Sequence, residues 1–126
     1  MGKLTNKLDE KLNGKAWIGL KDKFLGMCNE IVDASPDARG ELTTVYVKFT
    51  IDSSEESPVY AVAWFKNSQK WIVGLALPDT VESPIFVDPP KRYIGLTKYF
   101  YIESDTELPS TLLEWAEMAY KNKQAH

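Results

Sequence analysis

Aromatic side chains are the residues of this sequence whose types and spacing could most readily form a binding site. They make up 12% of the 126 residues. Several fall in segments that alternate like β-strands: Tyr46, Trp64, Trp71, Tyr93, Tyr99 and Tyr101. A sheet face that presents Trp and Tyr rings can stack against bases, sugars or other planar ligands. The same rings can instead form the surface on which a helix packs, so both interpretations stay open.

A second candidate site is the segment from Asp88 to Tyr93. Pro89 and Pro90 stiffen it, and the basic pair Lys91 and Arg92 follows directly before Tyr93. Arg beside Tyr suits a carboxylate or phosphate group, so an anionic ligand is one expectation. A solvated loop ahead of a strand explains the same residues. The predicted ligand-binding set is Trp64, Trp71, Lys91, Arg92, Tyr93, Tyr99 and Tyr101.

Carboxylates offer a third kind of chemistry. Glu103, Asp105 and Glu107 alternate, so a continuing strand would place them on one face, where they could hold a hard cation. Acids just ahead of a helix also favour its positive end, and we predict no metal site here. Glu103 with Tyr99 or Tyr101 could also serve as an acid–base pair, which keeps a small cofactor-independent enzyme as an alternative.

Other chemistries find no support in the sequence. The one histidine, His126, ends the chain, so histidine-based nucleophile pairs and histidine-ligated metals are not expected. The one cysteine, Cys28, falls in line with Phe24 and Ile31 on an apolar helix face, which indicates a buried structural thiol. Phosphate-binding and nucleophile-elbow motifs are absent, and we predict no cofactor.

Charge and hydropathy limit the kinds of partner and the cellular location that we expect for this protein. The net charge is −3, whereas polyanion binding usually needs a basic surface, so nucleic acid is a third-ranked partner. No run of about 18 apolar residues is present, so no membrane span is expected. The first residues do not form an apolar signal segment, and a single cysteine fits a reducing compartment. Together these features predict a cytoplasmic protein.

Hydrophobic periodicity predicts the elements. Leu4, Leu8 and Leu12 are four apart and predict an amphipathic helix over residues 3–13, and a second helix is predicted over 15–33. Strands are predicted at 44–51, 59–66, 70–77, 85–87 and 93–103, followed by a helix from about Pro109. This order predicts one α+β domain: an antiparallel sheet of four to five strands with N-terminal helices and a C-terminal helix packed on one face. The core is predicted at 15–121, after an N-terminal segment 1–14 and before a tail 122–126.

The two strands of the predicted central hairpin, 59–66 and 70–77, are apolar on both sides. Helices on one face of the sheet can cover only one of these sides. The second side then needs a ligand, a partner or a second subunit. We expect a homodimer through that face or along a sheet edge.

Four stretches resemble a known group of proteins: the strand 59–65, its hairpin partner 71–77, the segment 90–96 and the final helix 113–120 with its Trp115 and Tyr120. They resemble small uncharacterised bacterial domains of the YdhG type, which are related in architecture to MmcQ/YjbR proteins and to the frataxin-like (CyaY-like) fold. The resemblance covers about 15–121 and implies a helix-flanked antiparallel sheet in a bacterial protein, with no established activity. DNA binding does not carry over because the chain is acidic. Iron binding does not carry over because the first helices are rich in Lys.

The sequence thus favours a non-enzymatic domain that binds a small ligand or a protein through an aromatic sheet face. The alternatives are the carboxylate and tyrosine enzyme described above and a nucleic-acid-associated protein.

Overall fold

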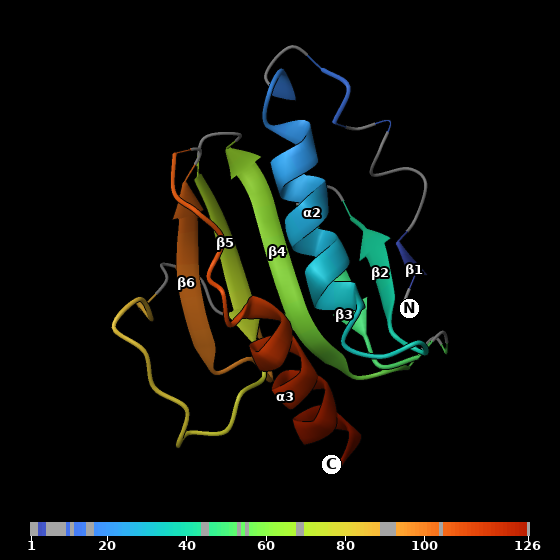
Figure 1. The fold of residues 1–126 in the computed structure, drawn as a ribbon. Helices are drawn as coiled ribbons and strands as arrows, with labels where there is room; N and C mark the ends of the chain where they lie inside the picture. The colour runs from blue at the N-terminus through green and yellow to red at the C-terminus, as the bar shows by residue number, and fades with distance from the viewer. Residues whose placement is uncertain are drawn as a thin grey trace.

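The computed structural model describes residues 3–4, 10, 12–14, 17–43, 46–52, 54, 56–67, 70–88, 93–103 and 105–125. The elements are β1 (Lys3–Leu4), α2 (Lys21–Val32), β2 (Arg39–Leu42), β3 (Tyr46–Thr50), β4 (Val59–Asn67), β5 (Lys70–Leu75), β6 (Lys98–Glu103) and α3 (Leu112–Gln124). Figure 1 shows both helices on the same face of the sheet.

The sheet follows the order of the chain. Strands β2 to β6 each pair antiparallel with the next, and the short β1 pairs parallel with β2, with Lys3 opposite Arg39. The predicted α+β architecture, with an antiparallel sheet and helices on one face, is confirmed. The predicted hairpin between 59–66 and 70–77 is confirmed as β4 and β5.

The N-terminal region departs from the prediction. Lys3 and Leu4 form a strand instead of the first turn of a helix, because the open edge of β2 provides partners for their backbone. The second helix begins only at Lys21, since Gly19 adopts a φ of +79° and interrupts the helical conformation. Only glycine adopts that conformation without strain.

The other element boundaries also shift. Residues Arg39–Leu42 form strand β2, where no strand is predicted. The predicted strand 85–87 is reduced to one bridge between Val87 and Tyr99. The strand predicted from Tyr93 begins only at Lys98, because Gly95 turns the chain at a φ of +90°. Helix α3 continues to Gln124, into the predicted tail.

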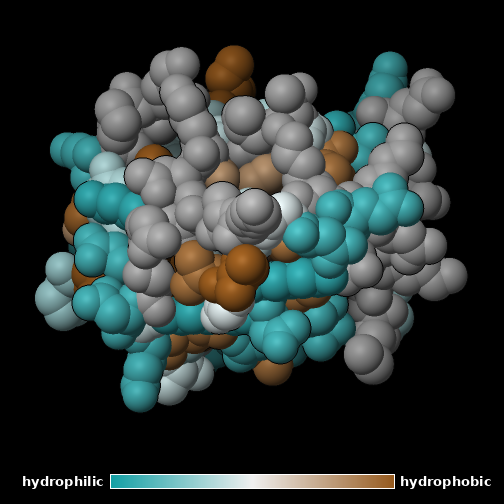
Figure 2. All heavy atoms as spheres, turned by 90° about the horizontal axis from the view of Figure 1, so that it is seen from above, coloured by the Kyte–Doolittle hydropathy of each residue, from teal (hydrophilic) through white to brown (hydrophobic). Residues whose placement is uncertain are grey.

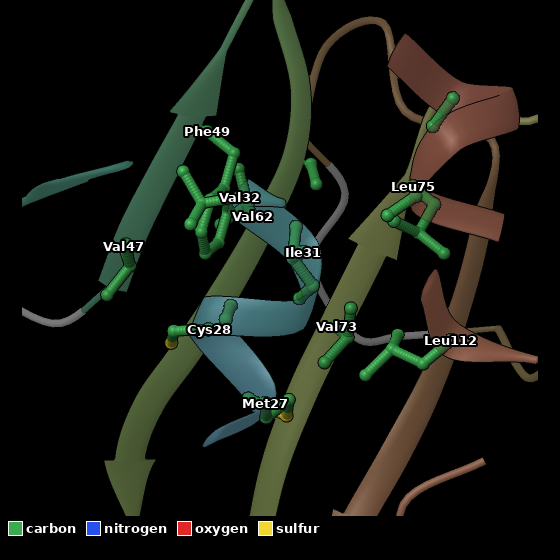
Figure 3. Packing of buried hydrophobic residues seen from close by; sticks show 14 of the residues in the cluster. Met27, Cys28, Ile31, Val32, Val47, Phe49, Val62, Val73, Leu75 and Leu112 are labelled. Atoms are coloured by element: carbon green, nitrogen blue, oxygen red, sulfur yellow. The ribbon is translucent and has the colours of Figure 1, made fainter. Parts of the chain in front are cut away.

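The core lies between the sheet and the two helices. Helix α2 buries Phe24, Met27, Cys28 and Ile31, as its spacing of three and four predicts. Figure 3 shows residues of this helix together with buried side chains of β3 and β5. The buried Tyr60 hydroxyl donates to the Ile31 carbonyl at 2.6 Å, so this polar group keeps a hydrogen bond inside the core.

The outer edge of β6 is occupied by other parts of the chain. Residues 76–88 run outside this strand in Figure 1, and the Val87 N–H donates to the Tyr99 carbonyl at 2.8 Å. Further along, the Lys23 ammonium donates to the Glu103 carbonyl at 3.0 Å. Covering an edge in this way opposes pairing with strands of other chains.

Neither helix is long and apolar enough to cross a membrane, within the part of the chain that the structure describes.

Burial of Cys28 yields a first prediction. Its side chain is fully buried in α2, and desolvation raises the pKa of the thiol far above its usual range. The reactive thiolate therefore does not form in the folded state. We expect the native protein to resist a thiol reagent such as DTNB at pH 8 and to react once urea unfolds it. Fast, stoichiometric labelling of the native protein, followed by absorbance, would contradict the burial of Cys28.

Candidate functional site

Four large side chains lie next to one another on the sheet face opposite the helices. The register places Tyr46 opposite Trp64, Trp64 opposite Ile72 and Ile72 opposite Tyr101. They therefore form one row across β3, β4, β5 and β6, which we call the aromatic row. Each of the four is half-buried. Such cross-strand neighbours are close enough to pack together, and the Tyr46 and Trp64 ring centroids lie 6.1 Å apart.

Alternation along the strands assigns the row to this face. Trp71 and Phe100 have the opposite parity on β5 and β6, and they contact the helices: the Trp71 ring lies 5.2 Å from Phe24 and the Phe100 ring 5.7 Å from Trp115. Because successive side chains of a strand point to opposite faces, Ile72 and Tyr101 point away from the helices.

The chain itself covers part of this second face. Leu96 is buried there, and its side chain and the Tyr99 ring lie against the backbone of Gly74. The Tyr99 hydroxyl accepts a hydrogen bond from the Tyr93 N–H at 2.7 Å and donates to the Tyr93 carbonyl at 3.2 Å. Tyr99 therefore holds residues 93–97 on the sheet, beside the aromatic row.

Tyr93 extends the row. Its ring lies 6.1 Å from that of Tyr46 in an edge-on arrangement. Partial burial, the nearby Tyr46 and a side-chain hydrogen bond to Tyr46 together raise the pKa of Tyr93. The Tyr93 phenol therefore stays neutral at physiological pH.

Two pairs of opposite charge lie at the two ends of the row. Lys48 Nζ is 3.9 Å from a Glu41 carboxylate oxygen on the β2–β3 side, and Lys70 Nζ is 4.0 Å from Glu103 on the β5–β6 side. Lys70 also lies 4.2 Å from the centre of the Tyr101 ring. Ion pairs at the surface contribute little to the stability of the fold. Their main effect is on the charge that a partner meets when it approaches the row.

The structure brings together part of the predicted ligand-binding set. Trp64, Tyr93 and Tyr101 lie on or beside the aromatic row, and Tyr99 is buried beneath the covering segment. Trp71 lies on the other face, fully buried and stacked 6.0 Å from Trp17, so it belongs to the core and cannot contact a ligand together with Trp64. Lys91 and Arg92 lie outside the described residues.

Two members of the row, Tyr46 and Ile72, were absent from the predicted set. Ile72 is aliphatic, and only the pairing of Trp64 with Ile72 shows that it, rather than Trp71, reaches this face. Because β5 is apolar on both sides, its sequence alone does not show which of its residues face the helices. The alternation in the predicted strand 44–51 places Tyr46 on the opposite side from Val47 and Phe49. This pattern could have identified Tyr46 as a member of the row.

The acid–base alternative is not supported by the geometry. Glu103 is exposed and lies beside Lys70, while the Tyr99 hydroxyl is engaged with the backbone of Tyr93. Asp105 and Glu107 follow β6 as exposed residues outside any strand. No group of three or more His, Cys, Asp or Glu residues within the described ranges is placed to hold a metal ion.

Two hollows lie away from the row. One, of about 280 Å³, is next to the start of α2, where Ile18 is 79% exposed. Figure 2, the view from above, shows apolar atoms next to hydrophilic ones on this face of the molecule. The other, of about 290 Å³, lies beside Val87 and Lys98. Neither contains a buried charged side chain that would orient a ligand.

The fold and the row together define an α+β domain with one sheet face under helices and an aromatic row on the other. No protein-family model matches the chain, and neither a curated protein nor a solved structure matches it. The likeness to YdhG-type and frataxin-like domains therefore stays a prediction.

The Tyr99 hydroxyl yields a second prediction. Tyr99→Phe keeps the ring and removes the hydrogen bonds to Tyr93, which leaves a half-buried N–H without this partner. We expect a loss of about 1–2 kcal/mol in the free energy of unfolding, measured by urea denaturation. Amide exchange at 93–97 should also become faster. Unchanged stability together with unchanged exchange would show that the hydroxyl does not hold this segment.

A pair of glycines yields a third prediction. A Cβ at Gly74 would lie 2.7 Å from Tyr99 Cε2 and 3.0 Å from Leu96 Cδ1, so Gly74→Ala should destabilise the protein by about 1–3 kcal/mol. Gly26 in α2 has no atom within 4 Å of such a Cβ, and Gly26→Ala should stabilise it by about 0.5–1 kcal/mol. Thermal unfolding of the two variants gives the comparison. Equal shifts in the same direction would contradict the packing of Tyr99 on Gly74.

Proposed function

We propose that this protein is a non-enzymatic binding domain whose contact surface is the aromatic row. The observation that carries the proposal is the alignment of Tyr46, Trp64, Ile72 and Tyr101 across four strands, half-buried, on the face that the helices leave uncovered.

The physical argument rests on what these side chains gain from a partner. Tyr and Trp rings bury large areas and lose little conformational entropy when they become ordered. Here Trp64 is already held between Tyr46 and Tyr99, whose ring stacks on it at 6.2 Å. A partner therefore meets a preorganised surface, which reduces the cost of binding.

The surface is better suited to contact than to catalysis. Among the described residues, the charged groups next to the row are half-buried or exposed Lys and Glu side chains in ion pairs. Neither hollow adjoins the row's central residues Trp64 and Ile72. An acid–base enzyme usually places its titratable group in a closed pocket that shifts the pKa. The four residues of the aromatic row lie on a sheet face and line neither of the two hollows described above.

The proposal includes a cytoplasmic location. It is supported by a single cysteine that is buried and unpaired, a usual condition in a reducing compartment. A bacterial origin is part of the proposal on the resemblance alone.

Binding can be tested with indole, a planar apolar probe, followed by NMR of the ¹⁵N-labelled protein. We expect saturable shifts of the amides around Trp64, Ile72 and Tyr101. The variant Ile72→Thr should weaken these shifts several-fold, because it removes apolar contact area while keeping a β-branched side chain.

The matched control is Ile18→Thr, the same substitution at an exposed position near the start of α2. It should leave the indole shifts at the row unchanged. Shifts that cluster around Trp17 and Ile18, or that never saturate, would reject the aromatic row as the binding surface.

A further inference from the structure

We infer that the occupant of the aromatic row is a second copy of this chain, so that the protein is a dimer formed face to face through the row. This inference rests on the proposed function of the row, and it adds the identity of the partner.

The first argument is the charge at the border of the row. Each end carries one Lys and one Glu: Lys48 with Glu41, and Lys70 with Glu103. A nucleic acid or other polyanion would meet the two carboxylates, and a strongly basic partner would meet the two ammonium groups. Among the residues that the structure describes, the border of the row thus carries both signs in equal number. Such a surface is complementary to another surface of the same composition, as a two-fold interface requires.

The second argument is the route by which copies can associate. Pairing through the edge of β6 is obstructed, because the Val87 N–H occupies the Tyr99 carbonyl and the Lys23 ammonium occupies the Glu103 carbonyl. At the other edge of the sheet, Arg39 and Gly40 of β2 are paired with β1, and the described strand β1 is only two residues long, so it offers little backbone for pairing. The sheet face with the aromatic row is therefore the more accessible route to self-association.

A third observation concerns the segment that borders the row. Ile94 lies between Tyr93 and Leu96, both of which pack on the sheet, yet Ile94 itself is 95% exposed. We infer that the second molecule also covers Ile94, which directly follows Tyr93 in the chain. Burial of a lone exposed isoleucine beside a row of half-buried aromatic residues adds apolar area to the same interface.

Light scattering behind a sizing column tests the inference on the complete chain. We expect the mass of two chains at micromolar concentration, and dissociation both on dilution and on addition of saturating indole, which competes with the second copy for the row. A mass of one chain at the highest soluble concentration would overturn the inference. If indole still shifts the row amides of such a monomer, the binding function stands without the dimer. If indole does not, both fail.

Charge reversal then tests whether the row is the interface. The acidic variant Lys48→Glu with Lys70→Glu, and the basic variant Glu41→Lys with Glu103→Lys, should each dimerise at least about tenfold more weakly than the natural chain, because like charges face each other. An equimolar mixture of the two should recover a mass of two chains. Recovery depends on both variants being folded, which circular dichroism checks.

The matched control carries the same charge change on the outer side of α3. Glu114→Lys with Glu117→Lys alters two exposed residues and should leave the dimer unchanged. If this control weakens the dimer as much as the basic row variant, or if both row variants dimerise as tightly as the natural chain, the interface lies elsewhere and the inference is wrong.

Discussion

The register between β4 and β5 determines which side chains reach the helices and which reach the opposite face. Trp64 pairs with Ile72 and Ala63 pairs with Val73, so Trp71 and Val73 enter the core while Ile72 joins the aromatic row. A slip of one residue would bury Ile72 under α2 and move the large Trp71 ring out of its stack with Trp17. The core, the row and the positions of the flanking charges all depend on this pairing.

On the sheet face opposite the helices, Tyr99 connects the aromatic row with the segment 93–97 that covers the sheet beside it. Its ring packs over Gly74 and stacks on Trp64, and its hydroxyl holds the backbone of Tyr93. One residue thus positions both the segment that covers part of this face and the ring at the centre of the uncovered part. The small size of Gly74 is what allows the Tyr99 ring to lie so close to the sheet.

Much of the fold could be predicted because period-2 and period-3.6 patterns are local properties of the chain. They identified α2, α3 and the strands β3 to β6, and they separated Tyr99 and Tyr101 from Phe100. The strand at Lys3 was missed because its stability comes from a distant partner, β2. For the same reason, the predicted site contains Trp64 and Tyr101 of the row but not Ile72, which only the pairing of β4 with β5 brings there. Strands apolar on both sides, such as β5, do not reveal their register until their neighbours are known.

The covered edge of β6 has a consequence for how large an assembly of this protein can grow. Sheets that expose an edge can add strands without limit, since each added chain offers a new edge. Here Val87 and Lys23 occupy backbone carbonyls on that side. An association through one face of each molecule uses that face up, so it ends at two chains. The association that we infer through the row is therefore a closed pair and not an open fibre.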